Sequence, residues 1–170
     1  LISTNYERFI EGSTQNGLKD KDAQEIWNLI VKFAGYGFNK SHSAAYALVS
    51  YQTAWLKTHY PAHFMAAVMS SELDKTDKIV VFVDECKRMD LSLKLPDVNE
   101  GQYMFTVNGN NEIIYGLGAI KGLGEGPVEN VLAARNAGGP FLDLFDFCGR
   151  TDPRKVNRRA IEAMVRAGAF

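Results

Sequence analysis

The chain has 170 residues, of which 46% are hydrophobic, 11% aromatic and 23% charged. This composition excludes a disordered segment and allows one large domain or two small ones. The net charge of −1 excludes a protein that binds nucleic acid through overall positive charge, so such a contact needs a local basic patch. No apolar run is long enough to cross a bilayer, and we see no signal peptide. The two cysteines, Cys86 and Cys148, lie among apolar neighbours, and we expect both to be reduced core residues of a cytoplasmic protein.

Two helices are expected in the first 34 residues. The first covers residues 4–16 and stops at Gly17. The second runs from about Asp22 to Ala34, with Asp22 as its cap and Glu25 completing a capping box. Its apolar residues recur at helical spacing and form one apolar face: Ile26, Leu29, Ile30 and Phe33.

Residues 35–43, which contain two glycines, are expected to form a loop before the next helix. Free amides at a helix start favour a negative ligand, and Lys40, Ser41 and His42 add a charge, a hydroxyl and a bulky donor. These parts suit a triphosphate or a backbone phosphate, although the spacing of a Walker loop is absent. The alternative is a glycine-broken junction whose aromatic residues pack in the core: Tyr36 and Phe38.

Three helices are expected between residues 43 and 89. The first, capped by Ser41 or Ser43, runs to about His59 and is apolar on most sides, which is typical of a helix buried within a larger body. Pro61 begins the second, which ends at about Leu73. The third runs from Thr76 or Asp77 to Met89, and its apolar face consists of Ile79, Val80, Val83 and Cys86.

The hydrophobic period changes to two after residue 90. Alternating Leu91, Leu93 and Leu95 predict a short strand. The two β-rich runs 103–107 and 112–115 flank an Asn-Gly turn, a strong hairpin signal. Helical patterns return at about 126–137, 141–148 and 155–167. The predicted fold is therefore mainly α with a small β-hairpin, divided near Pro96 into segments 1–95 and 96–170.

Glycines alternate with apolar residues over residues 116–127, between two expected short helices. This pattern is typical of a helix-hairpin-helix, whose glycines let the backbone approach a DNA phosphate while the second helix directs its amides at the same oxygen. Lys121 adds a salt-sensitive contact. The predicted DNA-binding residues are Lys121, Gly122, Leu123, Gly124 and Gly126. The alternative is a glycine-rich turn without a ligand.

Residues 131–170 are locally basic, with 7 Lys or Arg against 4 Asp or Glu. Such a patch can contact a phosphate backbone, and the alternative is a solvated helix face. The cations that cluster there are Arg150, Arg154, Lys155, Arg158, Arg159 and Arg166.

Two pairs of residues are considered as metal ligands, and neither pair supports a metal site. Asp20 and Asp22 could resemble the paired carboxylates of a two-metal site, but they lie at a polar helix entrance, where capping is the better interpretation. His59 and His63 are four residues apart, but Pro61 lies between them and no acidic ligand is near. We assign no metal-binding residue.

Three stretches resemble the alpha-subunit family of bacterial DNA polymerase III, the replicative C-family polymerases. They are residues 33–67, which contain FAGYGFNKSHSAAYA, residues 115–124, which read YGLGAIKGLG, and residues 157–170. The resemblance covers essentially the whole chain in the right order. Because the chain also begins at Leu1 without a methionine, we expect an interior fragment that contains part of the fingers and the helix-hairpin-helix region.

The resemblance implies a parent enzyme that is a template-directed DNA polymerase using deoxynucleoside triphosphates and Mg²⁺. Its catalytic aspartates lie before Leu1, so we expect the fragment alone to be inactive and to hold no cofactor. In the family the fingers close over the incoming nucleotide, so Lys40 would meet its phosphates and His42 would stand near the sugar, where it could exclude a ribose 2′-hydroxyl. The nucleotide-binding residues implied are Tyr36, Phe38, Asn39, Lys40, Ser41 and His42.

The resemblance also implies partners and a location. The partners are primer-template DNA, an incoming nucleotide, and the remaining domains of the polymerase and its holoenzyme, in the bacterial cytoplasm and without a membrane. Two alternatives of another class remain: a stand-alone helix-hairpin-helix module that binds DNA, and a structural domain that docks to other proteins.

Overall fold

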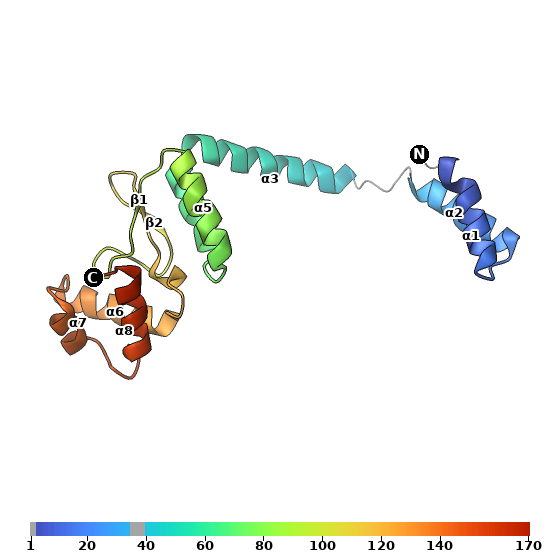
Figure 1. Ribbon diagram of the computed structural model, residues 1–170. Helices are drawn as coiled ribbons and strands as arrows, with labels where there is room; N and C mark the ends of the chain where they lie inside the picture. Colours follow the sequence, from blue (N-terminus) through green and yellow to red (C-terminus); the bar gives the residue numbers. More distant parts are fainter. Residues whose placement is uncertain (1–2, 35–39) are drawn as a thin grey trace. The chain divides into compact units, whose positions relative to one another are not determined.

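The computed structural model describes residues 3–34 and 40–170, and the chain forms two compact units, Leu1–Tyr51 and Gln52–Phe170. The described residues contain eight α-helices and one small three-stranded sheet (Figure 1). The expected fold class, mainly α with a small β-hairpin, is confirmed.

The first unit contains a helical hairpin. After a 3-10 turn, Ser3–Asn5, helix α1 (Tyr6–Gln15) ends before Gly17, whose φ of +91° reverses the chain, and helix α2 (Asp20–Ala34) follows. The two helices pack through aromatic rings, because Tyr6 and Phe9 lie 5.5 and 5.2 Å from the ring of Trp27. These ring contacts bury a stripe of α2 centred on Ala23 and Trp27.

One expectation for α2 is wrong. The helix begins at Asp20, and the amide of Ala23 already donates to the carbonyl of Lys19, so Asp22 lies inside the first turn and is not the cap. The expected apolar face is exposed, because α1 covers the neighbouring stripe around Trp27. The exposed residues are Ile26, Leu29, Ile30 and Phe33.

Helix α3 (Lys40–His59) also differs from expectation. It begins at Lys40, so Ser41 and Ser43 lie inside the helix and neither is its N-cap. None of its residues is buried, although the side chains that face outward are largely apolar. The larger body expected around this helix is therefore not supplied by the residues that the structure describes. The exposed apolar side chains are Tyr46, Leu48, Val49, Tyr51, Trp55 and Leu56.

The second unit begins within α3, which a helical pair follows, α4 (Pro61–Ser70) and α5 (Thr76–Arg88). Pro61 is the first residue of α4, as expected, because proline lacks the amide that a first-turn residue leaves unused. One face of α5 is covered through Ile79 and Cys86, whereas Val80, expected on that face, is 57% exposed. These residues share a hydrophobic cluster with α4 and with the sheet.

The sheet has three short strands in the order β1-β3-β2. β1 (Leu93–Lys94) pairs in parallel with β3 (Ile113–Ile114), and β2 (Thr106–Val107) pairs antiparallel with β3. Oδ1 of Asn108 accepts the amides of Asn110 and Glu112 at 3.0 Å each, which closes the predicted hairpin turn. The predicted strand at 91–95 is shorter than expected, and Leu95 is 76% exposed.

Three helices complete the second unit: α6 (Glu125–Gly138), α7 (Leu144–Arg150) and α8 (Arg158–Ala167). They surround a second hydrophobic cluster that includes Phe147 and Met164, both fully buried. Figure 1 shows the three helices grouped at one end of the unit, with the sheet between them and α5. Cys148 is exposed on α7, so the expectation of two core cysteines holds only for Cys86, whose pKa is raised by burial.

Candidate nucleic-acid interface

A tight backbone hairpin joins the sheet to α6. A 3-10 turn, Leu117–Ala119, leads into Ile120, the chain turns at Lys121 and Gly122, and α6 begins after Gly124. Gly122 has a φ of +88°, which a side chain would strain, and the amide of Leu123 closes the turn by donating to the carbonyl of Ile120 at 3.0 Å. Lys121 and Gly122 are exposed at the tip.

The hairpin is anchored from beneath by apolar side chains. Leu117, Ile120 and Leu123 are at most 7% exposed and belong to one cluster with Val128 and Val131 of α6. The predicted packing of α6 against the element that precedes the hairpin is therefore present, although that element is a 3-10 turn and not an α-helix. Leu123, one of the predicted DNA-binding residues, is 5% exposed, so it anchors the hairpin.

The glycines of this segment divide into two groups. A Cβ at Gly116 would lie 2.7 Å from the amide nitrogen of Phe105, and one at Gly118 would lie 2.7 Å from the ring of Tyr103. A Cβ at Gly124 or Gly126 would meet nothing within 4 Å. The first group is thus required for internal packing, and the second leaves the outer surface of the hairpin open. The sequence interpretation gave all the glycines a role in close approach to DNA. Internal packing accounts for Gly116 and Gly118 without that role, and for Gly124 and Gly126 it stays a prediction.

The start of α6 leaves amides without acceptors. Gly124 precedes the helix with an extended backbone and offers no capping side chain. Among the residues that the structure describes, none accepts from the amides of Glu125 or Gly126, and Pro127 has no amide to donate. Two N–H groups at the positive end of a 14-residue helix therefore lack an acceptor among the described residues, and both residues are exposed. The carboxylate of Glu125 lies in the same turn and opposes an anion there.

Arg135 holds α6 to the segment that leads into the sheet. It is only 9% exposed, and its Nη1 donates to the carbonyls of Val98 at 2.9 Å and Gly101 at 2.8 Å. Burial lowers the pKa of this guanidinium. Arg135 was not among the predicted site residues, although its position seven residues after the buried Val128 and four after Val131 placed it on the apolar face of the helix.

The basic patch of the last forty residues is smaller than predicted. The guanidinium of Arg150 donates to the carbonyls of Ala134 and Gly139 and lies 4.5 Å from the centre of the Phe141 ring. Arg150 also pairs with Asp146, whose pKa is held below its ordinary value by the amide of Leu142 and by this guanidinium. Arg150 is therefore a packing residue and is removed from the predicted patch.

Two further arginines of the patch are paired on the surface. Arg154 pairs with Asp152 at 3.0 Å, and Arg158 pairs with Glu162 at 2.8 Å. Lys155, Arg159 and Arg166 are exposed and form no ion pair with any residue in 3–34 or 40–170.

The predicted nucleotide-binding loop is described in part. Tyr36, Phe38 and Asn39 lie outside the described residues. Lys40, Ser41 and His42 form the first turn of α3 and are exposed, and the ring of His42 lies 4.1 Å from that of Tyr46.

The residues considered as metal ligands do not form a cluster. Asp20 and Asp22 lie in the exposed first turn of α2, where Oδ2 of Asp20 accepts from Gln24. His59 packs on Trp55, and the ring of His63 is nearly perpendicular to that of Tyr60, with 6.4 Å between the ring centres. Within the described ranges no three His, Cys, Asp or Glu side chains are close enough to hold a metal ion. None of the helices described there is long and apolar enough to span a membrane.

Residues 90–170, which include the hairpin, match the family described as "Helix-hairpin-helix motif". Curated relatives match almost the whole chain. The chain is 62% identical to "DNA polymerase III subunit alpha" of Vibrio cholerae, 60% to that of Escherichia coli K12 and 58% to that of Pseudomonas aeruginosa. Each comparison spans 162 residues, which are 95% of this chain and 14% of the relative. The chain therefore spans about one seventh of the length of these proteins.

Proposed function

Because the chain belongs, over the segment that it spans, to the family of bacterial DNA polymerase III alpha subunits, we propose that it contributes DNA and nucleotide contacts to a DNA-directed DNA polymerase. The observation that supports the DNA contact is the hairpin at 120–126, with open glycines and unpaired amides above a buried apolar anchor. The match of residues 90–170 to the helix-hairpin-helix family supports the same interpretation.

The DNA contact is made through the backbone. A phosphate oxygen accepts the amides of Glu125 and Gly126, and its charge is favoured by the positive end of α6. Gly124 and Gly126 let the phosphate come close because they place no Cβ on the open side. Lys121, exposed at the tip, adds a second and purely electrostatic contact. Such contacts position the duplex and do not read its sequence.

The nucleotide contact is assigned to the first turn of α3 and the residues before it: Tyr36, Phe38, Asn39, Lys40, Ser41 and His42. Lys40 is placed at the phosphates and His42 near the sugar. The exposure of both side chains on one helical turn is compatible with a ligand there. The polymerase reaction of the family uses Mg²⁺, which neutralises the charge of the transferred phosphates. Asp20 and Asp22 do not suit it, so we place its ligands elsewhere in the full-length polymerase and expect the 170-residue chain alone to be inactive.

The proposed organisation keeps residues 1–95 as a fingers segment and residues 96–170 as the DNA-binding segment. Its partners are primer-template DNA, an incoming deoxynucleotide, and the remaining polymerase and holoenzyme, in the bacterial cytoplasm. The exposed apolar side chains of α3 support a neighbouring body there. The alternatives, a stand-alone DNA-binding module and a purely structural docking domain, are not favoured, because similarity to alpha subunits extends over 95% of the chain.

Replacing Lys121 by alanine tests the DNA contact. One lost phosphate contact is expected to reduce the slope of log affinity against log salt by about 0.9. The measurement is fluorescence anisotropy of labelled primed duplex across a salt series. Lys78, an exposed lysine of α5 without an ion pair among the described residues, provides the matched control, and Lys78→Ala is expected to leave the slope unchanged. Equal slopes for the two variants would remove Lys121 from the interface.

Replacing His42 by alanine in the intact polymerase tests the nucleotide contact. If this side chain occupies the space of a ribose 2′-hydroxyl, ribonucleotide insertion rises relative to deoxynucleotide insertion, by roughly tenfold for each 1.4 kcal/mol of discrimination lost. The readout is the ratio of kcat/KM values for the two nucleotides. His63→Ala is the control, because His63 is exposed on α4 outside the proposed site. Unchanged discrimination in His42→Ala would contradict the assigned role.

A further inference from the structure

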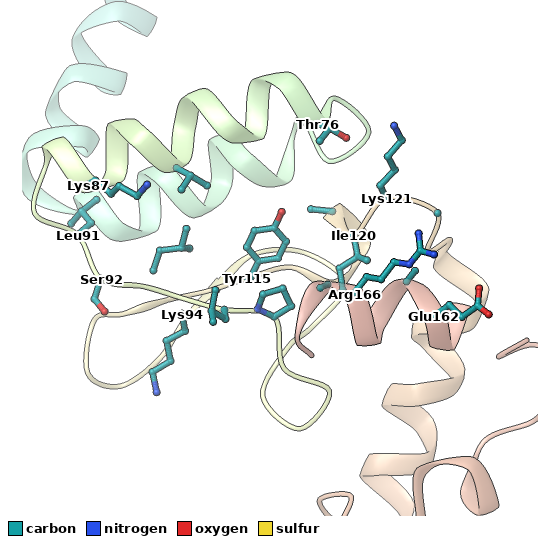
Figure 2. Close-up of a pocket in the computed structure, with 18 of the residues that line it drawn as sticks. Thr76, Lys87, Leu91, Ser92, Lys94, Tyr115, Ile120, Lys121, Glu162 and Arg166 are labelled. Atoms are coloured by element: carbon teal, nitrogen blue, oxygen red, sulfur yellow. The ribbon is translucent and has the colours of Figure 1, made fainter. Parts of the chain in front are cut away.

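A groove of about 1230 Å³ adjoins the hairpin within the second unit. Figure 2 shows its walls: α5, the extended segment around Leu91–Pro96, the hairpin tip and α8. Its volume exceeds the roughly 300–1,000 Å³ of a small-molecule pocket. The size therefore favours a polymer segment as its occupant.

The charges along the groove are strongly biased. The charged lining residues are five cations and one carboxylate, Glu162. Lys87 is neutralised by Asp84, and Lys94 lies near both Glu112 and Glu100. The other three cations form no ion pair with any residue in 3–34 or 40–170, whereas Glu162 is paired with Arg158. The cations without an ion pair are Lys121, Arg159 and Arg166, and Figure 2 shows Lys121 and Arg166 at the same end of the groove.

The rest of the lining is mainly apolar, with Leu91, Leu93 and Ile120 among its side chains. Figure 2 shows the hydroxyl of Tyr115 pointing into the space below α5, and burial raises the pKa of this hydroxyl. Apolar surface beside unpaired cations suits a single nucleic-acid strand, whose bases have exposed faces. A duplex would contact the groove only through its phosphates, because its base faces are stacked on one another and cannot contact the apolar lining.

We propose that this groove binds a single DNA strand that continues from the duplex held at the hairpin. The inference rests on the proposed function, because Lys121 and Gly122 line the groove and also form the hairpin tip. Arg159 and Arg166 of α8 contact the phosphates of the strand, and its bases lie against Leu95 and the rest of the 91–96 segment. Charge complementarity and continuity with the hairpin define this occupant.

The test compares a blunt duplex with the same duplex carrying a single-stranded oligo-dT tail of about eight nucleotides at either the 5′ or the 3′ end. Binding of the 170-residue chain is measured by fluorescence anisotropy. One of the tails is expected to increase affinity roughly tenfold, equivalent to one or two stacked bases. The variant Arg159→Gln/Arg166→Gln is expected to lose most of this gain. Both arginines are exposed, so the fold is retained, and a thermal unfolding curve verifies it.

The matched control is Arg8→Gln/Lys78→Gln, which removes two exposed cations that do not line the groove and is expected to keep the gain. The proposal is overturned if neither tail adds affinity, or if the gain survives in the groove variant. It is also overturned if an oligoglutamate peptide of equal charge displaces the tail as well as free oligo-dT does, since the groove would then be a protein docking site. Blunt-duplex binding reports on the hairpin separately, so failure of the hairpin contact and failure of the groove are distinguishable.

Discussion

Replacing Arg135 by methionine is expected to lower the free energy of unfolding by about 3 kcal/mol. The side chain is 9% exposed, and its guanidinium supplies both hydrogen bonds that hold the carbonyls of Val98 and Gly101 to α6. Methionine keeps the apolar volume of the side chain but leaves the two carbonyls without that donor. Each unsatisfied buried group costs roughly 1–3 kcal/mol.

The measurement is urea unfolding followed by circular dichroism, with the midpoint compared between variant and parent. Arg154→Met is the control, because Arg154 is exposed and its pair with Asp152 lies on the surface, where such pairs contribute at most about 1 kcal/mol. A shift in Arg135→Met no larger than that of the control would show that the two hydrogen bonds contribute little. The expected loss matters for function, because α6 also presents the amides of the hairpin.

Replacing Gly124 by serine is expected to weaken duplex binding about tenfold while leaving the fold as stable as before. Gly124 precedes α6 with φ −81° and ψ 173°, a conformation that serine adopts freely. The serine hydroxyl would accept the amide of Gly126 and act as a helix cap, worth a few tenths of a kcal/mol over glycine. The hydroxyl would thus take the amide of Gly126 that the proposed phosphate needs. The serine Cβ would also fill space through which the phosphate approaches.

Duplex anisotropy and thermal unfolding are measured on the same protein, since the expected result is a loss in the first without a loss in the second. Gly149→Ser is the control: Gly149 lies in α7, and a Cβ there also meets nothing within 4 Å. Unchanged affinity in Gly124→Ser would indicate that no phosphate approaches the start of α6, whatever the role of Lys121.

Local signals in the sequence predicted several elements well. The Asn-Gly turn between β-rich runs predicted the β2–β3 hairpin, and Pro61 predicted the start of α4. The glycine pattern at 116–127 predicted the hairpin before α6, and residues 90–170 match the corresponding motif family. These features depend on backbone preferences within a few residues, so they can be predicted without knowing which distant residues pack against them. The nucleotide-binding role of residues 36–42 stays a prediction.

Tertiary packing decided which side chains are covered, and hydrophobic periodicity alone could not predict this. An apolar stripe on α2 was visible in the sequence, but the rings of α1 cover the stripe around Trp27 and leave Phe33 69% exposed. The sequence does not distinguish Arg150 from the exposed Arg166, yet the guanidinium of Arg150 donates to the carbonyls of Ala134 and Gly139. The sequence by itself determined where the chain turns, at the Asn-Gly dipeptide and at the glycine-rich hairpin, and where α4 begins. Which apolar face is covered, and which arginine remains available to a phosphate, depends on partners far along the chain, and only the fold brings those together.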